Sequence, residues 1–320
     1  MKKISILVPM FNEQEVLPSL YDRLSSLMNA NPDYEWEVVM VDDGSQDNTA
    51  LLALQMRERD KRFHIVELSR NFGKETAMLA GIDTVSGDCM VIMDADLQHP
   101  PEVIPEMIKK WEEGYDDVYG KRISRGKEPW LRKKLTEFYY NLLQKSAHIP
   151  IIKNVGDFRL LDKSCVNALR QLRETHRYTK GLYCYIGFKK TSVDFEQGDR
   201  EAGETKWNYF KLLGLAIEGI TSYTTLPLRI ATMMGSVISM GAMIYLVYVL
   251  FKTFLVGDPV AGFPTIIVCL LFLGGIILLT LGVLGEYIAR IFDESKQRPA
   301  YFIREVDGKR QKDGRGREIE

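Results

Sequence analysis

The chain has 320 residues, with 42 lysines and arginines against 43 aspartates and glutamates, so its formal net charge is -1. This balance excludes the overall positive charge that is typical of proteins that bind nucleic acid. Hydrophobic residues make up 46% and charged residues 27%, which excludes a disordered chain. The mean hydropathy of -0.13 excludes a chain that lies in a membrane throughout. The four cysteines have no CxxC spacing, so we expect reduced thiols rather than disulfides or a zinc site.

The first hundred residues alternate between strand-like and helix-like patterns. Apolar segments predict strands at residues 4–9, 36–41, 63–68 and 89–93, and helical spacing predicts helices at residues 13–28, 49–59 and 74–85. This order predicts an α/β fold with a mostly parallel sheet that is covered by helices on both faces. Ligands of such sheets bind beyond the carboxyl ends of the strands, and polar clusters fall there at residues 11–13, 42–45 and 94–96.

The pattern weakens after residue 120. We predict a helix at residues 130–147, a short strand at 156–161, a helix at 163–173 and an edge strand at 191–196. Residues 209–223 place aromatic and aliphatic side chains on one helical face, which predicts a helix in the membrane interface, with an ordinary surface helix as the alternative. Residues 307–320 are charged and contain glycine, so we expect them to be disordered.

Residues 230–251 and 263–285 contain no charged side chain. Each segment is about 20 residues long, which is enough to cross a bilayer, so we predict two transmembrane helices rather than two buried helices of a soluble protein. Basic residues flank the pair at Arg229, Arg290, Lys296, Arg298 and Arg304, which predicts that both chain ends are cytoplasmic. The expected organisation is a catalytic domain at 1–208, an interfacial region at 209–227, a two-helix membrane domain at 228–290 and a cytoplasmic tail at 291–320.

Two carboxylates follow the fourth predicted strand. Asp94 and Asp96 are two positions apart, so both side chains point the same way if the extended geometry continues. Carboxylate oxygens suit Mg²⁺ or Mn²⁺, particularly when a substrate diphosphate completes the coordination. A solvated acidic turn is the alternative. Asp42 and Ser45 follow the second strand, where they can cap the next helix, and this role can coexist with hydrogen bonding to a base or ribose.

Six motifs occur in this order along the chain: ILVPMFNE at 6–13, VDDGS at 41–45, NFGK at 71–74, DADLQHPPE at 94–102, GDFRL at 156–160 and REAGETKW at 200–207. Together they resemble the inverting family 2 glycosyltransferases of GT-A fold. Within that family the resemblance is strongest to the polyprenyl-phosphate glycosyltransferases, which include dolichyl-phosphate mannose synthase and the bacterial bactoprenol glucosyltransferases with two C-terminal membrane helices.

The resemblance implies a role for each residue that matches a motif. Asp94 would contact the nucleotide sugar, Asp96 would hold Mg²⁺ or Mn²⁺ on the diphosphate, and Gln98 would lie in the same catalytic turn. Asp157 would be the carboxylate on the acceptor side, where it either orients the acceptor or accepts a proton. The residues implied to bind the nucleotide are Pro9, Phe11, Glu13, Asp42 and Lys74, and those implied to face phosphates of donor or acceptor are Arg122, Arg200 and Lys206.

The expected activity is transfer of a hexose, in the first instance glucose from UDP-glucose, to undecaprenyl or another polyprenyl phosphate, with inversion. The reaction would take place at the cytoplasmic face of the inner or plasma membrane. GDP-mannose and UDP-N-acetylglucosamine are alternative donors. A polysaccharide synthase is disfavoured because the chain lacks a QxxRW motif, and a non-catalytic membrane scaffold is the remaining alternative. Expected partners are the nucleotide sugar, the lipid phosphate and the membrane but no nucleic acid, and a homo-oligomer is compatible with the sequence.

Overall fold

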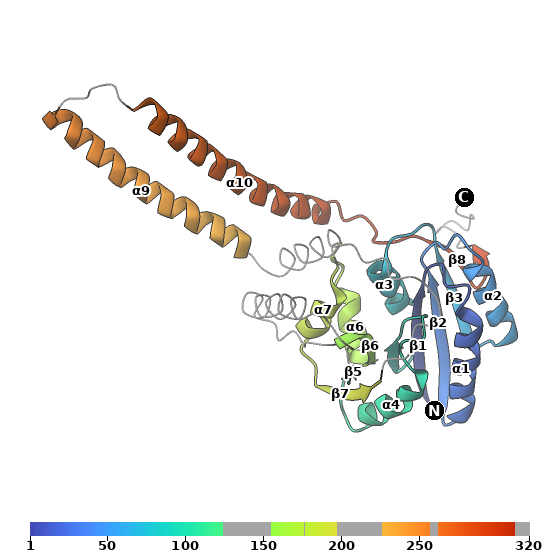
Figure 1. Ribbon diagram of the computed structural model, residues 1–320. Helices are drawn as coiled ribbons and strands as arrows, with labels where there is room; N and C mark the ends of the chain where they lie inside the picture. Colours follow the sequence, from blue (N-terminus) through green and yellow to red (C-terminus); the bar gives the residue numbers. More distant parts are fainter. Residues whose placement is uncertain (124–154, 176, 197–225, 257–261, 311–320) are drawn as a thin grey trace. The chain divides into compact units, whose positions relative to one another are not determined.

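The computed structural model describes residues 1–123, 155–175, 177–196, 226–256 and 262–310 (Figure 1). These residues fall into two compact units. The first contains the described residues up to 196 together with 298–310, and the second contains 226–256 and 262–297. The helices predicted at 130–147 and 209–223, and the predicted site residues Arg200 and Lys206, lie outside the described residues.

The first unit is built on a single sheet, which has nine strands within the described residues. The strands are β1 (Lys2–Met10), β2 (Tyr34–Asp42), β3 (Phe63–Leu68), β4 (Cys89–Ile92), β5 (Asp117–Arg122), β6 (Val155–Asp162), β7 (Lys190–Phe195), β8 (Ile303–Val306) and β9 (Lys309–Arg310). Their order across the sheet is β7-β5-β6-β4-β1-β2-β3-β8-β9.

The sheet is mixed rather than mostly parallel. The pairs β1–β2, β1–β4 and β2–β3 are parallel, as predicted. The prediction is wrong for the outer part, where β6 lies antiparallel to both β4 and β5, and β8 lies antiparallel to β3. The reason is that β6 inserts between β4 and β5, although more than thirty residues separate it from the end of β5. Local sequence patterns predict strands but do not encode such long-range pairing.

Helices cover both faces of the sheet in the first unit (Figure 1), as predicted. They are α1 (Leu17–Ala30), α2 (Thr49–Arg59), α3 (Lys74–Thr84), the 3-10 helix η1 (Pro101–Val103), α4 (Ile104–Glu112), α6 (Lys163–Gln171) and α7 (Thr179–Tyr185). The start of α6 shows why a helix begins at this position in the sequence. The Asp162 carboxylate accepts a hydrogen bond from the Ser164 N–H at 2.8 Å and so satisfies an amide that has no partner within the helix.

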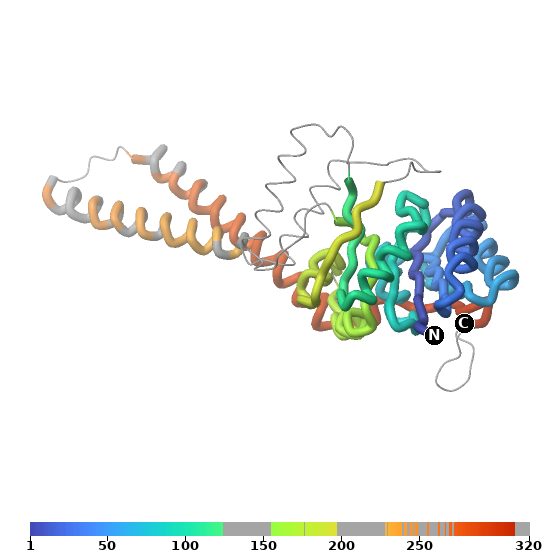
Figure 2. Tube along the Cα trace, turned by 90° about the horizontal axis from the view of Figure 1, so that it is seen from below, coloured from blue at the N-terminus to red at the C-terminus, as the bar shows by residue number. Residues whose placement is uncertain are grey.

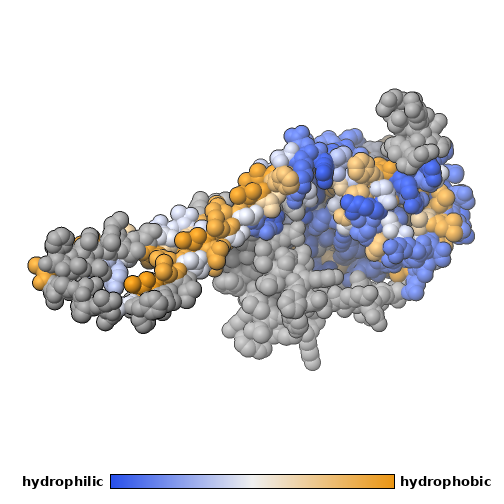
Figure 3. Space-filling model, turned by 90° about the horizontal axis from the view of Figure 1, so that it is seen from above, coloured by the Kyte–Doolittle hydropathy of each residue, from blue (hydrophilic) through white to orange (hydrophobic). Residues whose placement is uncertain are grey.

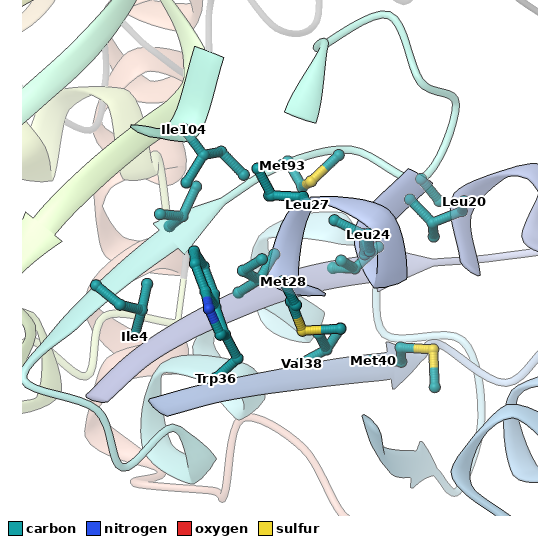
Figure 4. Packing of buried hydrophobic residues seen from close by; sticks show 14 of the residues in the cluster. Ile4, Leu20, Leu24, Leu27, Met28, Trp36, Val38, Met40, Met93 and Ile104 are labelled. Carbon is teal, nitrogen blue, oxygen red and sulfur yellow. The ribbon is translucent and has the colours of Figure 1, made fainter. Parts of the chain in front are cut away.

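A hydrophobic core lies between β1 and β2 on one side and α1 on the other (Figure 4). Leu24 and Met28 of α1 pack toward Trp36 and Val38 of β2, and Leu20 lies further along the same face of the helix. The helical spacing of these apolar residues is the reason that one face of α1 is buried.

The opposite face of the sheet meets α3. A Cβ atom added to Gly81 of α3 would lie 2.0 Å from Leu7 Cδ1 of β1. Because Gly81 has no side chain, α3 approaches the sheet closely. This contact sets the position of α3, whose first residue is the predicted site residue Lys74.

A buried carboxylate joins β1 and β2 near the amino ends of the strands. Glu37 accepts hydrogen bonds from the Ser5 hydroxyl, from the Ser86 N–H at 3.0 Å and hydroxyl at 2.8 Å, and from Lys3 Nζ at 3.2 Å. Burial opposes ionisation of Glu37, but these donors hold its pKa below the ordinary value of 4.5. The network lies away from the carboxyl ends of the strands, and it stabilises the sheet by linking β1, β2 and the segment before β4.

The chain returns to this sheet after the second unit (Figure 2). The disorder predicted from Asp307 onward is wrong for residues 307–310, since Asp307 N donates to Ile65 O at 2.9 Å and β9 pairs with β8. The predicted cytoplasmic tail at 291–320 therefore contains part of the sheet of the first unit. Strand β5 and helices α4 and α7 also had no counterpart among the predicted elements.

The second unit is a hairpin of two long helices, α9 (Leu226–Val256) and α10 (Phe263–Ser295), which pack against each other. Many large apolar side chains on both helices are exposed, as the hydrophobic surface along the hairpin in Figure 3 shows. Among the described residues, one stretch, Phe272–Ser295, is long and apolar enough to cross a membrane by length and composition. Two spans therefore stay a prediction.

Candidate active site

The loops that follow β1 and β2 are tied together at the carboxyl edge of the sheet. Asn12 N donates to Ser45 Oγ at 2.9 Å, and Gln46 N donates back to Asn12 Oδ1 at 2.8 Å. The Asp42 carboxylate accepts hydrogen bonds from the Ser45 hydroxyl and from the Ser45 N–H at 3.1 Å. Burial raises the pKa of Asp42, while the Ser45 donors oppose that rise. The pairing fixes the orientation of Asp42 at the end of β2.

A third loop is held by Asp43, whose role the sequence analysis missed. Its two carboxylate oxygens accept hydrogen bonds from Phe72 N at 2.7 Å and Gly73 N at 2.8 Å. Gly44 has a φ of +71°, and a Cβ atom there would lie 2.6 Å from the carbonyl carbon of Arg70. Only glycine allows this close approach. The DDGS motif thus links the ends of β2 and β3.

The residues implied to bind a nucleotide differ in exposure. Pro9 is buried within β1, next to Val41 of β2, and helps to form the end of that strand. The Phe11 ring is 40% exposed at the loop surface. Glu13 is partly buried, and its N–H donates to Thr49 Oγ1 at 2.8 Å. Phe11 and Glu13 thus lie in the loop after β1, which the Asn12–Ser45 and Ser45–Asp42 hydrogen bonds connect to Asp42 at the end of β2.

Lys74 connects Asp94 and Asp157, the two carboxylates that the resemblance predicts on the donor and acceptor sides. Its Nζ lies 2.6 Å from Asp94 Oδ1 and 3.3 Å from Asp157 Oδ2. Burial opposes the charge on Lys74, but the two carboxylates raise its pKa. Burial likewise opposes ionisation of Asp94, but the Lys74 ammonium lowers the pKa of that carboxyl. Residues from α3, from the loop after β4 and from β6 therefore meet at one cation.

The turn after β4 is compact. Asp96 Oδ1 accepts a hydrogen bond from Gln98 N at 3.2 Å, and Leu97 between them has a φ of +56°. Asp94 N donates to His99 Nδ1 at 3.4 Å, and the His99 ring stacks on Phe158 with 4.9 Å between the ring centroids. Burial lowers the pKa of His99. We conclude that neutral His99 supports the turn that carries Asp94, Asp96 and Gln98.

Strand β6, which carries Asp157, is held by a buried network of charged side chains. Arg159 lies two positions further along the strand, and its Nη1 contacts the Asp117 oxygens at 3.1 and 3.3 Å. Lys190 Nζ reaches Asp117 Oδ2 at 2.8 Å, and the Arg159 guanidinium stacks over the Tyr183 ring at 3.7 Å. Asp117 is fully buried. This network crosses β5, β6, β7 and α7 and holds β6 in place.

Helix α7 is anchored beside the same site. Glu75, the neighbour of Lys74, accepts hydrogen bonds from the Thr179 hydroxyl and from the Thr179 N–H at 3.0 Å. Burial raises the pKa of Glu75. Sequence reasoning missed Glu75, although its position directly after the NFGK motif is a local signal. No local pattern pointed to Thr179.

Of the three predicted phosphate-binding residues, Arg122 is the one that the structure describes. A Cβ atom on Gly156 would lie 3.7 Å from Arg122 Nη2 and 3.8 Å from His99 Nε2. The Arg122 guanidinium therefore lies beside Gly156 at the start of β6, and Gly156 directly precedes Asp157 in the chain. This position fits an anion that approaches the carboxylate cluster.

The donor set suits a divalent cation only in part. Within the described ranges, no group of three or more His, Cys, Asp or Glu side chains forms a preformed metal site. Asp94 and Asp96 are two carboxylates on one short turn, and a protein commonly holds Mg²⁺ through one or two carboxylates while substrate phosphates and water complete the shell. The residues therefore fit a metal that binds together with a diphosphate.

Comparisons with known proteins agree with this arrangement. The family described as "Glycosyl transferase family 2" matches residues 5–170, and the family described as "GtrB C-terminal hairpin" matches residues 226–291. A prophage bactoprenol glucosyl transferase homolog of Escherichia coli strain K12 is 41% identical and covers 95% of this chain and 99% of its own length. The chain belongs to glycosyltransferase family 2.

Further relatives extend over nearly the whole of this glycosyltransferase. An uncharacterized glycosyltransferase of Synechocystis is 42% identical, with 96% of each chain covered, and the bactoprenol glucosyl transferase of Shigella phage SfV is 41% identical, with 94% and 98% covered. Glucosyl-3-phosphoglycerate synthase from Mycobacterium tuberculosis, solved with Mn²⁺, UDP-glucose and phosphoglyceric acid, is a distant structural neighbour with 18% identity, a TM-score of 0.48, and 69% and 78% coverage. The family assignment makes this chain an enzyme with a GT-A α/β fold and a mixed sheet.

Proposed function

We propose that this glycosyltransferase moves a hexose, in the first instance glucose from UDP-glucose, onto a polyprenyl phosphate, with inversion at the anomeric carbon. The observation that carries the proposal is the Asp94–Lys74–Asp157 cluster at the carboxyl edge of the sheet. It joins the motif on the donor side to the carboxylate on the acceptor side. Relatives named bactoprenol glucosyl transferase, at 41% identity, support the glucosyl group and the polyprenyl acceptor.

The reaction is a single displacement. A phosphate oxygen of the acceptor forms a bond to the anomeric carbon while the bond from that carbon to the diphosphate oxygen breaks, and the nucleoside diphosphate leaves. A bound Mg²⁺ or Mn²⁺, with Asp96 as its main protein ligand and Asp94 beside it, would supply Lewis-acid stabilisation of charge on the leaving diphosphate. Gln98 belongs to the same turn and holds its shape through its backbone N–H.

The acceptor needs little help to ionise. A phosphate monoester has a second pKa of about 6, so it is mostly dianionic at neutral pH. Asp157 then orients the reactants rather than removing a proton. Its Oδ2 is held by Lys74, whereas its buried Oδ1 has no hydrogen-bond partner among the residues that the structure describes. That oxygen suits a hydroxyl group of the sugar. The Arg122 guanidinium supplies positive charge for a phosphate, whereas the Lys74 ammonium is shared between Asp94 and Asp157.

The nucleoside part of the donor fits the connected loops after β1 and β2. The exposed Phe11 ring offers a stacking surface for a base, and the oriented Asp42 carboxylate offers acceptors for base or ribose donors. Pro9 lies next to the last residue of β1, Met10, and Glu13 lies in the tied loop that follows. Arg200 and Lys206 are proposed, from the family resemblance, to face the phosphates of the donor or acceptor.

A lipid acceptor requires contact with a membrane. The exposed apolar surface of the α9–α10 hairpin and the match to the GtrB C-terminal hairpin support insertion of both helices. We propose two spans in the inner or plasma membrane, with the catalytic unit and both chain ends in the cytoplasm, because basic residues flank the pair. The nucleotide sugar is then available on the same side as the site.

The test is a transfer assay with the purified full chain in detergent. The protein is incubated with undecaprenyl phosphate, Mg²⁺ and radiolabelled UDP-glucose, GDP-mannose or UDP-N-acetylglucosamine, and label is counted in the lipid extract. We expect lipid label from UDP-glucose, with a β-linked glucose, and loss of that label in Asp157→Asn. Asp194→Asn, an exposed carboxylate on β7, is the matched control and should stay active.

Other outcomes would contradict parts of the proposal. Label from a different donor would change the sugar but keep the acceptor. Labelled polymer that forms without lipid phosphate would indicate a polysaccharide synthase. Binding of UDP without transfer to any lipid would indicate a non-catalytic scaffold and refute the proposed activity.

A further inference from the structure

Residues 301–310, named here the return segment, add an edge to the sheet beside β3 (Figure 1). In the antiparallel pairing, Glu67 lies opposite Glu305, but its neighbour Leu68 lies opposite Ile303. Arg304 is therefore the extra residue of a β-bulge. A bulge turns a side chain away from its regular direction, and bulges are common next to active sites.

The return segment is fixed at both ends. On one side, Tyr301 Oη donates to Asp83 Oδ2 at 2.7 Å. On the other, Asp307 Oδ1 accepts from Ile65 N at 3.0 Å, and Asp307 Oδ2 lies 3.0 Å from His64 Nδ1 and 3.1 Å from Arg57 Nε. Five residues separate Tyr301 from the end of α10 at Ser295. The segment after the hairpin is thus a built part of the catalytic unit.

The bulge brings a positive charge to a row of carboxylates. Asp42, Glu67 and Glu305 are register partners across β2, β3 and β8, so their backbones lie side by side. Asp42 and Glu67 are both buried. The Arg304 guanidinium donates a hydrogen bond to Glu67 Oε2. A buried carboxylate needs a counter-charge or hydrogen-bond donors, and Arg304 provides both for Glu67 beside the end of β2.

Arg304 also acts on Asp42 itself. Burial raises the pKa of Asp42, and the charge of Arg304 is one of the influences that oppose that rise. The Arg304 side chain is 54% exposed, so solvent screens part of this effect. The geometry of the bulge, rather than the size of the effect, places Arg304 beside the carboxylate that the proposed function assigns to the nucleoside.

We propose that Arg304 is a positioning residue for the nucleotide: by pairing with Glu67, it keeps a second carboxylate from competing with Asp42 for nucleoside donors. Part of the nucleotide site is then supplied by chain that follows the hairpin. This inference rests on the proposed function only in taking Asp42 as a nucleoside ligand, and it does not depend on the acceptor.

The test measures affinity for UDP and GDP, with Mg²⁺, by calorimetry on the full chain in detergent. We expect Arg304→Ala to weaken binding of the preferred nucleotide about tenfold, the size of losing one charge-assisted contact. In the transfer assay, the donor KM should rise by a similar factor while kcat stays within about twofold. Arg304→Lys should recover part of the affinity, because the charge is kept and the planar fork is lost.

Two further variants separate positioning from other roles. Glu67→Gln combined with Arg304→Ala removes both charges and should restore affinity close to that of the unmodified protein. Arg310→Ala, which lies in the same segment and pairs with Glu305 at 3.7 Å on the surface, is the matched control and should bind normally. Thermal unfolding of each variant confirms that the fold is kept.

Unchanged affinity in folded Arg304→Ala would overturn the inference. So would a loss that Glu67→Gln fails to restore, since Arg304 would then contact the nucleotide directly or act only on the fold. A protein that binds UDP but labels no lipid would refute the proposed acceptor and leave the comparison between variants intact. A protein that binds neither nucleotide would overturn both.

Discussion

Removal of the charge on Asp117 tests whether the buried network beneath Asp157 holds the catalytic strand. Asp117 is fully buried between two cations, with Arg159 Nη1 at 3.1 Å and Lys190 Nζ at 2.8 Å. Asp117→Asn keeps the shape of the side chain and removes its charge. The Arg159 side chain, which is 5% exposed, then loses its counter-charge in a place that water does not reach.

The expected loss of stability follows from these exposures. Breaking a buried ion pair by removing one partner costs about 3–5 kcal/mol. Lys190 is 18% exposed and can regain water, so the lower end, about 3 kcal/mol, applies. In a domain of about 200 residues, 1 kcal/mol shifts the unfolding midpoint by roughly 2–4 °C, so we expect a shift of roughly 6–12 °C.

The assay is thermal unfolding of the full chain in detergent, followed by intrinsic fluorescence. Asp194→Asn, which changes an exposed carboxylate on the neighbouring strand, should move the midpoint by less than about 2 °C. Asp117→Leu combined with Arg159→Met removes both charges and should be more stable than Asp117→Asn, because apolar replacement of a buried pair is often neutral. A midpoint for Asp117→Asn that matches the control would refute the reasoning.

Three further predictions concern the carboxylates and the cations around them. The pKa of Glu37 is lowered in the folded protein, so the carboxylate stabilises the fold above pH 4.5, and this stabilisation is lost as the pH falls through the lower folded pKa. Glu37→Gln should therefore lower the unfolding midpoint at pH 7. The midpoint of this variant should also decline less below about pH 4.5 than that of the unmodified protein, as measured by thermal unfolding at several pH values. Lys74→Met leaves Asp94 and Asp157 without the ammonium that they share. Added Mn²⁺ should therefore raise the unfolding midpoint of this variant more than the midpoint of the unmodified protein. An equal rise in both proteins would contradict the bridging role of Lys74. Excess EDTA should abolish lipid labelling, with recovery on added Mg²⁺ or Mn²⁺, and activity that survives chelation would refute metal use. Asp96→Asn, which removes the charge but keeps an oxygen for the Gln98 N–H, should lose most turnover with little change in the unfolding midpoint.

The sequence by itself predicted the parallel half of the sheet and the edge at which the site lies. Strands β1 to β4 are short apolar runs separated by helices, and their parallel direction follows from that alternation, whereas their order β4-β1-β2-β3 was not predicted. Asp42 is the last residue of β2 and Asp94 lies two positions after β4, so their placement at the carboxyl edge needed only the strand boundaries. Asp157 was predicted from a motif, and the structure brings it to Lys74.

Tertiary structure alone decided how these residues work together. The Lys74 bridge depends on α3, the turn after β4 and β6 meeting in space, and no spacing along the chain encodes that meeting. Strand β5 has the sequence DVYGKR, which is too polar to stand out by pattern, and it forms because β6 and β7 pair with it on both sides. From its sequence, the return segment was assigned to a cytoplasmic tail, because its few apolar residues do not predict strands by themselves. It becomes an edge of the sheet because β3 offers unpaired backbone groups and Asp307 finds its partners on β3 and α2.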